Sequence, residues 1–89
     1  MKTVVSVIGK DAVGIISRVS AVCAECNANI VDITQSVLQD MFVMVMLTEI
    51  KDINCSFADY SEKMKKLGQS RGLDIRVMHE DVFNSMHRI

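Results

Sequence analysis

A seven-residue segment with two glycines, GKDAVGI at positions 9–15, joins a strand-like pattern to a helix-like pattern near the start of the chain. Residues 3–8 before it are mostly β-branched and short in extent, whereas apolar residues after it recur at helical spacing. The chain therefore turns tightly from a strand into a helix. We expect Gly9 to adopt a positive φ in this turn and Asp11 to accept a hydrogen bond from the first amides of the helix.

We expect that helix to span residues 12–27, which places Gly14 in its first turn. The apolar stripe of the helix is Ile15, Val19, Val22 and Cys26. Glycine there costs stability relative to alanine, so a packing or binding role is expected, because a residue without a Cβ lets another backbone or a small ligand approach. The exposed amides of a helix start favour a carboxylate or another anion. The segment is then either a tight turn alone or a turn that also binds a small ligand.

The remainder of the chain predicts three more strands and a second helix. Residues 29–38 alternate as in a half-exposed strand, with the apolar Val31, Ile33 and Val37 on one face, and Gln39 and Asp40 form a hairpin turn. Residues 41–47 are apolar on both faces, which is typical of a central strand. A helix follows from Ser56, which begins a capping-box-like sequence, to Gly72, and residues 73–79 alternate again. The stripe predicted for this helix is Phe57, Tyr60, Met64 and Leu67.

The element order βαββαβ predicts an α+β fold, the ferredoxin-like plait. Right-handed crossovers give a four-stranded antiparallel sheet in the order 4-1-3-2 with both helices on one face. We expect one domain over residues 1–79 and an extension over residues 80–89. This extension contains an apolar helical turn with Val82, Phe83 and Met86. The second sheet face must then be covered by this extension or by another subunit, because large apolar patches are rarely left exposed. We therefore expect a homo-oligomer.

Charge and composition exclude several function classes. The net charge of −1, without a basic stripe, argues against a nucleic-acid partner, and no apolar run approaches the ~20 residues of a membrane span. The N-terminal residues lack a signal-type apolar core, and three cysteines without a disulfide-framework spacing fit a reducing compartment. A cytoplasmic location is the expectation.

Two clusters of chemically active side chains are better explained by structure than by chemistry. Cys23 and Cys26 form a CxxC pattern late in the first helix, on its apolar stripe, and are expected to pack as small hydrophobic groups. The tail residues His79, Glu80, Asp81 and His87 have no specific metal-ligand spacing. No nucleophile, base and orienting group can be assembled, so we expect no enzyme, no catalytic residue, no metal and no cofactor.

Three segments carry a family resemblance: residues 9–15, the strand opening NIVDI at 29–33, and the closing HEDVF with MHRI at 79–89. Together they resemble the ACT domain, and in particular the small stand-alone ACT proteins of the uncharacterised family related to the glycine-cleavage-system regulator. ACT domains pair and bind amino acids or other small metabolites at subunit interfaces. The resemblance implies ligand contacts from Asp11, Val13, Gly14 and Ile15 in the loop, with Asn29 and Ile30 supplied across the interface.

These observations favour a homodimeric regulatory domain that binds a small metabolite, an amino acid by resemblance, and that acts through a partner enzyme or regulator. The ligand's carboxylate is expected at the amides around Val13 and Gly14. Asp11 or Asn29 is expected to receive its ammonium group. The alternative is an interaction module whose pairing and tail surfaces are the function, with no small-molecule ligand.

Overall fold

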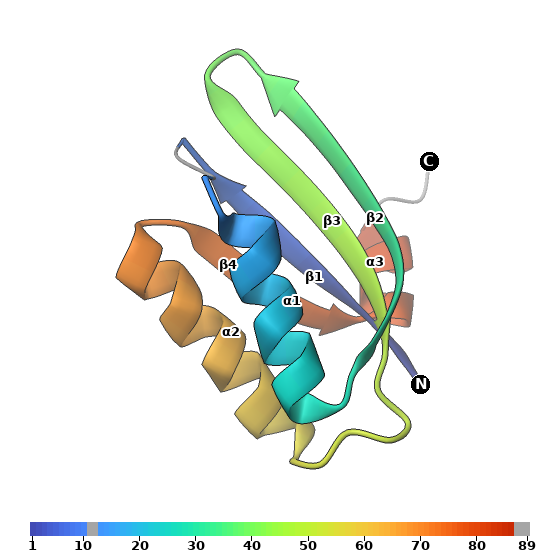
Figure 1. The fold of residues 1–89 in the computed structure, drawn as a ribbon. Coiled ribbons are helices and arrows are strands. Elements are labelled where there is room, and N and C mark those ends of the chain that lie inside the picture. Colours follow the sequence, from blue (N-terminus) through green and yellow to red (C-terminus); the bar gives the residue numbers. More distant parts are fainter. Residues whose placement is uncertain (11–12, 87–89) are drawn as a thin grey trace.

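The computed structural model describes residues 1–10 and 13–86, and two long helices cover one face of its four-stranded antiparallel sheet (Figure 1). The elements, in chain order, are β1 (Lys2–Gly9), α1 (Ile15–Cys26), β2 (Asn29–Leu38), β3 (Met41–Glu49), α2 (Phe57–Arg71), β4 (Asp74–His79) and α3 (Glu80–Met86). The strand order is β2-β3-β1-β4, which confirms the predicted plait. The helix α3 lies behind the sheet, on the face opposite α1 and α2 (Figure 1).

The hydrophobic core fills the space between the sheet and the two long helices. Every second side chain of β1 and β3 points into it, as strand geometry requires. The fully buried apolar side chains include Val5 and Val7 of β1, Met44 and Met46 of β3, Ile15, Val19, Cys23 and Cys26 of α1, and Tyr60 and Met64 of α2. The apolar stripes predicted for both helices are therefore confirmed, and both cysteines of the CxxC pattern are core residues.

The first helix begins later than predicted. Gly14 is its N-cap, with φ 74° and ψ 3° in the left-handed region, and the helix starts at Ile15. A left-handed residue cannot belong to a right-handed helical turn, so the placement of Gly14 inside the first turn was wrong. Glycine is needed at this position for its conformation, because a side chain there would be strained. Asp11 and Ala12, and with them the predicted cap by Asp11, lie outside the described residues.

The role expected for Gly9 was also wrong. Gly9 ends β1 opposite Phe42 of β3 and has no positive φ. A Cβ placed on it would clash with Cδ2 of Leu73. Gly9 therefore serves packing, because a side chain at this position would force the Leu73 side chain to move from its place against the strand.

The strand β2 differs from a simple alternation because it contains a bulge. The register against β3 shifts between Ile30 and Asp32, and this leaves Val31 46% exposed. Ile30 and Ile33, on either side of the bulge, both pack against the core. The predicted alternation, with Val31 and Ile33 on one face, is therefore interrupted at the bulge, and Val31 does not pack against the core as Ile33 does.

The second helix is bounded as predicted. The Ser56 hydroxyl accepts a hydrogen bond from the Asp59 amide at 3.1 Å, and Gly72 ends the helix with φ 69°. Inside the helix, Gly68 is buried so closely against β4 that a Cβ would lie 2.7 Å from the carbonyl oxygen of Leu73. This helix therefore packs its backbone directly on the sheet.

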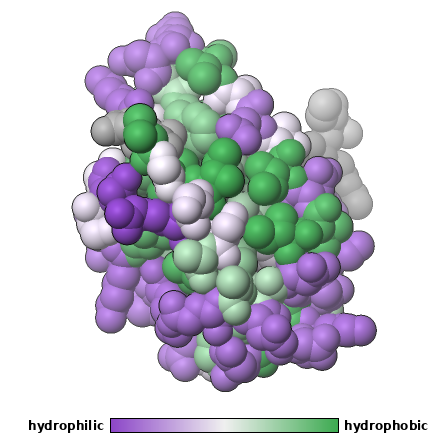
Figure 2. All heavy atoms as spheres, in the orientation of Figure 1, coloured by the Kyte–Doolittle hydropathy of each residue, from purple (hydrophilic) through white to green (hydrophobic). Residues whose placement is uncertain are grey.

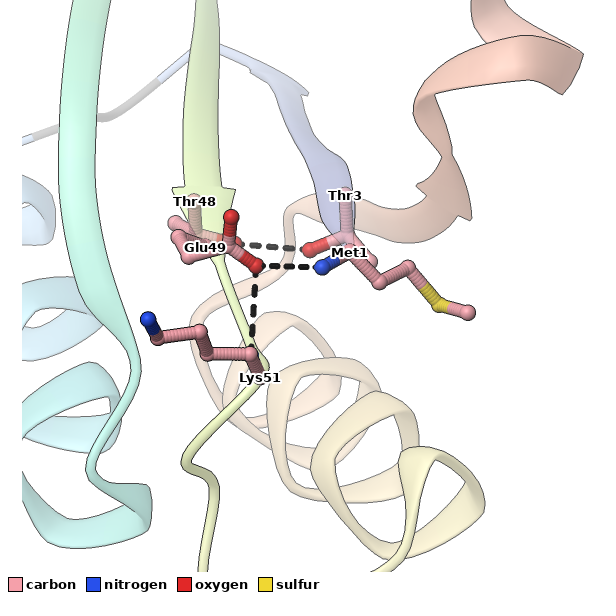
Figure 3. A network of polar contacts seen from close by, with 5 residues as sticks. All are labelled: Met1, Thr3, Thr48, Glu49 and Lys51. Atoms are coloured by element: carbon pink, nitrogen blue, oxygen red, sulfur yellow. Dashed lines mark hydrogen bonds and ion pairs between the residues drawn. The ribbon is translucent and has the colours of Figure 1, made fainter.

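Polar groups inside the core and at one sheet end are paired. Thr3 and Thr48 share a hydrogen bond of 2.7 Å between their hydroxyls, and the Thr48 hydroxyl lies 3.2 Å from that of Tyr60. Beside them, the Glu49 carboxylate accepts from the Met1 amino group at 2.6 Å and the Lys51 amide at 3.2 Å (Figure 3). These bonds tie β1 to β3 where β1 begins. No helix among the described residues is long and apolar enough to cross a membrane.

Candidate functional site

The loop after β1 leads into the start of α1. At this point there is open space at the position that a side chain would occupy. Gly14 is exposed, its carbonyl accepts the first bond of the helix from Arg18 at 3.2 Å, and no side chain caps the helix. The amides at the start of the helix precede this first intrahelical bond, so they have no acceptor within the helix. The loop therefore offers donors at a position with no Cβ to obstruct them.

An arginine from the end of α2 completes this corner. The antiparallel packing of α1 and α2 places the last turn of α2 beside the first turn of α1 (Figure 1). Arg71 donates a hydrogen bond of 2.8 Å from Nη2 to the carbonyl oxygen of Val13, and the same nitrogen lies 3.8 Å from the position of a Cβ on Gly14. The guanidinium is thus held at the loop, next to the free helix start.

The electrostatics of the corner favour an anion. No acidic residue occupies the first turn of α1, so its partial positive charge is not neutralised from within the helix. Arg71 adds a full positive charge. The cation of the loop itself, Lys10, lies 3.6 Å from the Asp40 carboxylate in the β2–β3 hairpin turn, and this ion pair attaches the loop to that turn.

We call the set Val13, Gly14, Ile15 and Arg71 the loop site. Its members Val13, Gly14 and Ile15 are the described part of the contacts predicted for the loop, while Arg71 was missed. The side chain of Val13 is 81% exposed, but that of Ile15 is in the core, so Ile15 offers only its backbone to a ligand. The sequence signal at Arg71 is a cation in the last turn of a helix that ends at Gly72, and this signal does not point to a ligand site.

The other two predicted contacts lie at the opposite end of the sheet. Asn29 pairs with Glu49, which pairs on its other side with Lys2, whereas the loop follows Gly9 at the far end of β1. Asn29 lines a polar hollow of about 430 Å³ together with Asn27, Glu49 and Lys51. Within one chain, therefore, Asn29 and Ile30 do not meet the loop site.

The thiols of Cys23 and Cys26 and the ring of His79 are held in packing contacts. Burial raises the pKa of Cys23, and burial beside Cys55 raises that of Cys26 to about 11, so both thiols stay protonated near neutral pH. The His79 ring stacks on Phe57 with ring centroids 4.6 Å apart. No three metal-ligating side chains come together in residues 1–10 and 13–86. His87 lies outside those ranges.

Comparisons with known proteins agree with this fold. A family model described as the ACT domain matches residues 2–78. A UPF0237 protein of Methanopyrus kandleri is 47% identical over 88 residues, which cover 99% of this chain and 98% of that protein.

Solved structures give the same result. The ACT domain protein from Streptococcus pneumoniae superposes with a TM-score of 0.80 at 32% identity, over 93% of both chains. A putative glycine cleavage system transcriptional repressor shares the fold, with a TM-score of 0.67 at 23% identity over 85% of this chain and 43% of that one. The chain belongs to the ACT domain family, among its UPF0237 members.

Proposed function

We propose that this chain is a regulatory ACT domain that binds a small amino acid through its carboxylate at the loop site. The observation that carries the proposal is the Arg71 guanidinium, held 2.8 Å from the Val13 carbonyl beside a helix start with no side-chain cap. Charge-assisted hydrogen bonds from arginine and from helix-start amides are the interactions that carboxylates receive in proteins. A regulatory role, without chemistry on the ligand, fits the family.

A second copy of the chain supplies the other half of this site in the proposal. β2 is an edge strand of the sheet, so the backbone groups on its outer side are open to another strand. Pairing two β2 strands antiparallel brings the start of β2 of one copy, with Asn29 and Ile30, to the hairpin end of the other. That end also holds the loop site, since Lys10 contacts Asp40 there. Figure 2 shows apolar surface gathered over β2, which supports an interface on this side.

The ligand's ammonium group is then assigned to oxygen acceptors, namely the Asp11 carboxylate or the Asn29 side chain of the second copy. Both ends of an amino acid would be recognised by groups of the correct polarity. A ligand with a carboxylate alone would lack the second set of contacts and bind more weakly.

Thermal unfolding of the purified protein against each of the twenty amino acids tests the proposal. A ligand at ~100 times its dissociation constant stabilises the folded state by ~2.7 kcal/mol. For a domain of this size that stabilisation raises Tm by about 10 °C or more. We expect one or a few amino acids to do so, and Arg71→Met to lose the effect. Lys66→Met, on the exposed face of the same helix, is the matched control and should keep it.

The exposed hairpin supports one other candidate. Val37 and Leu38 are each 71% exposed at the end of β2, which suits a protein-interaction module. Absence of any thermal shift, with a stable oligomer present, would favour this function over ligand binding.

A further inference from the structure

The sheet face turned away from α1 and α2, here the open face, is apolar on its two central strands. Because Val5 and Val7 enter the core, the residues between and after them point to the open face. The strand pairings place these side chains at two neighbouring levels, one made of Val45, Ser6 and Arg76 and the next of Val43, Ile8 and Asp74. At these two levels, the charged side chains of β3, β1 and β4 thus all belong to the edge strand β4.

The short helix α3 covers this face only in part. Phe83 of α3 borders a hollow of about 400 Å³, which Ile8, Val43 and Val45 line from the sheet. Ile8 keeps 39% of its surface exposed, and on α3 Val82 keeps 48%. Apolar surface therefore remains on both the central strands and the helix that lies over them.

We propose that the open face binds the open face of a second copy of this chain, with the two-fold axis running across the strands between the two levels. In such an isologous contact, each level of one sheet faces the other level on the same strand of its partner. Val45 then faces Val43 of the partner subunit on β3. On β4, Arg76 faces Asp74 of the partner subunit, and the reverse pair forms by symmetry.

Charge complementarity selects this axis and this occupant. Within one chain, Arg76 Nε already lies 3.2 Å from a carboxylate oxygen of Asp74. The two-fold axis brings two such ion pairs together, so that positive and negative side chains alternate around a ring of four. An axis along the strands would instead place β4 over β2 of the partner subunit, where Arg76 meets the uncharged Thr34 at the same level. Only the axis across the strands matches opposite charges at the edge and apolar side chains at the centre.

The open face lies on the broad side of the molecule. The molecule is a slab with Cα extents of 36 × 33 × 19 Å, and a two-layer fold has the sheet along its broad side. A standard interface buries ~800 Å² on each partner. The proposed contact uses the part of the broad side that α3 leaves uncovered.

This contact is separate from the pairing of β2 edges in the proposed function, although it deepens the same proposal of a dimeric regulatory domain. If both contacts form, the assembly is a tetramer with two kinds of two-fold interface. If only the open face pairs, the assembly is a dimer that leaves the loop site incomplete. Loss of the open-face contact halves the mass in either case, whereas failure of the loop site shows as absence of ligand binding.

A charge-reversal pair tests the inference by light scattering and sedimentation at low salt. Asp74→Arg makes both β4 positions cationic and Arg76→Asp makes both anionic, so each variant alone should associate about tenfold more weakly or worse and run at half the mass of the unaltered protein. Mixing the two variants should restore the full mass, because cationic and anionic faces then meet. Unchanged masses of the single variants, or no recovery on mixing, would overturn the proposed axis. A monomeric unaltered protein would overturn the interface itself.

An apolar substitution with a matched control tests the centre of the face. Val45→Glu places a carboxylate opposite Val43 of the partner subunit and should give the half mass. Ile16→Glu lies on α1, in the helix layer on the opposite side of the sheet, at an exposed position, and should keep the full mass. Far-ultraviolet circular dichroism on each variant checks that the fold is retained. The same mass for both variants would overturn the assignment of the interface to the open face.

Discussion

The two left-handed glycines allow the role of Gly14 in binding to be separated from its role in the backbone. Gly14 has φ 74° at the start of α1, and Gly72 has φ 69° at the end of α2. A Cβ on Gly72 meets no heavy atom within 4 Å, and on Gly14 the nearest is Arg71 Nη2 at 3.8 Å, an ordinary contact. Alanine at either position is therefore strained by conformation and not by a clash.

The expected loss of stability is similar for the two variants. A left-handed conformation costs a residue with a Cβ ~1–2 kcal/mol. Alanine also lowers the conformational entropy of the unfolded chain, and this offsets ~0.4–1 kcal/mol of the cost. The net loss of about 1 kcal/mol lowers Tm by about 4–8 °C in a domain of this size.

Ligand binding should differ between them. In Gly14→Ala the methyl group enters the space between the helix-start amides and Arg71, so we expect affinity for the stabilising amino acid to fall about tenfold or more, which corresponds to ~1.4 kcal/mol. Gly72→Ala should keep the affinity of the unaltered protein. Differential scanning calorimetry measures the two Tm values, and titration calorimetry measures the two affinities. Equal affinities would refute the placement of the ligand at Gly14.

Three further predictions concern the core. Gly68→Ala brings a methyl group to 2.7 Å from the Leu73 carbonyl oxygen. We expect this overpacking to lower the free energy of unfolding in urea by ~1–3 kcal/mol, despite the better helix propensity of alanine. A more stable variant would show that the helix can shift. Tyr60→Phe removes a hydroxyl that lies 3.2 Å from the buried hydroxyl of Thr48. We expect the free energy of unfolding to fall by ~1–2 kcal/mol in the same assay. No change would show that the hydrogen bond to Thr3 alone satisfies Thr48. Burial raises the pKa of Cys26 from 9.0 to about 11. As the pH rises, the thiol therefore loses its proton in the unfolded chain before it does so in the folded protein. The free energy of unfolding falls between those pH values, by up to ~1.4 kcal/mol per pH unit. The variant Cys26→Ala should flatten this alkaline decline, and the same slope in both proteins would contradict the assignment.

Most of the fold could be predicted because its signals are local and repeat along the chain. Apolar periodicity located both long helices, and the capping serine and the glycine at position 72 marked the bounds of α2. The apolar character of residues 41–47 placed β3 inside the sheet, and the element order then fixed the topology. These signals depend on neighbouring residues, so tertiary contacts did not change them.

The errors arose where a distant contact decided the local structure. Gly9 looks like a turn glycine in sequence, but its role is to admit Leu73 from the other end of the chain. The bulge at Val31 leaves no composition signal, and it reverses which residues of β2 face the core. Arg71 belongs to the loop site only because α2 runs antiparallel to α1, a contact that spans 58 residues of sequence.

The most direct measurement is a titration of isotope-labelled protein with the amino acid that gives the largest thermal shift, followed residue by residue by NMR. We predict that the backbone amides of Val13, Gly14 and Ile15 and the guanidinium signals of Arg71 shift together, with one dissociation constant, and that Asn29 shifts with them in the dimer. Saturable shifts confined to other residues, or no shift with any amino acid, would contradict a carboxylate-binding regulatory domain at this loop.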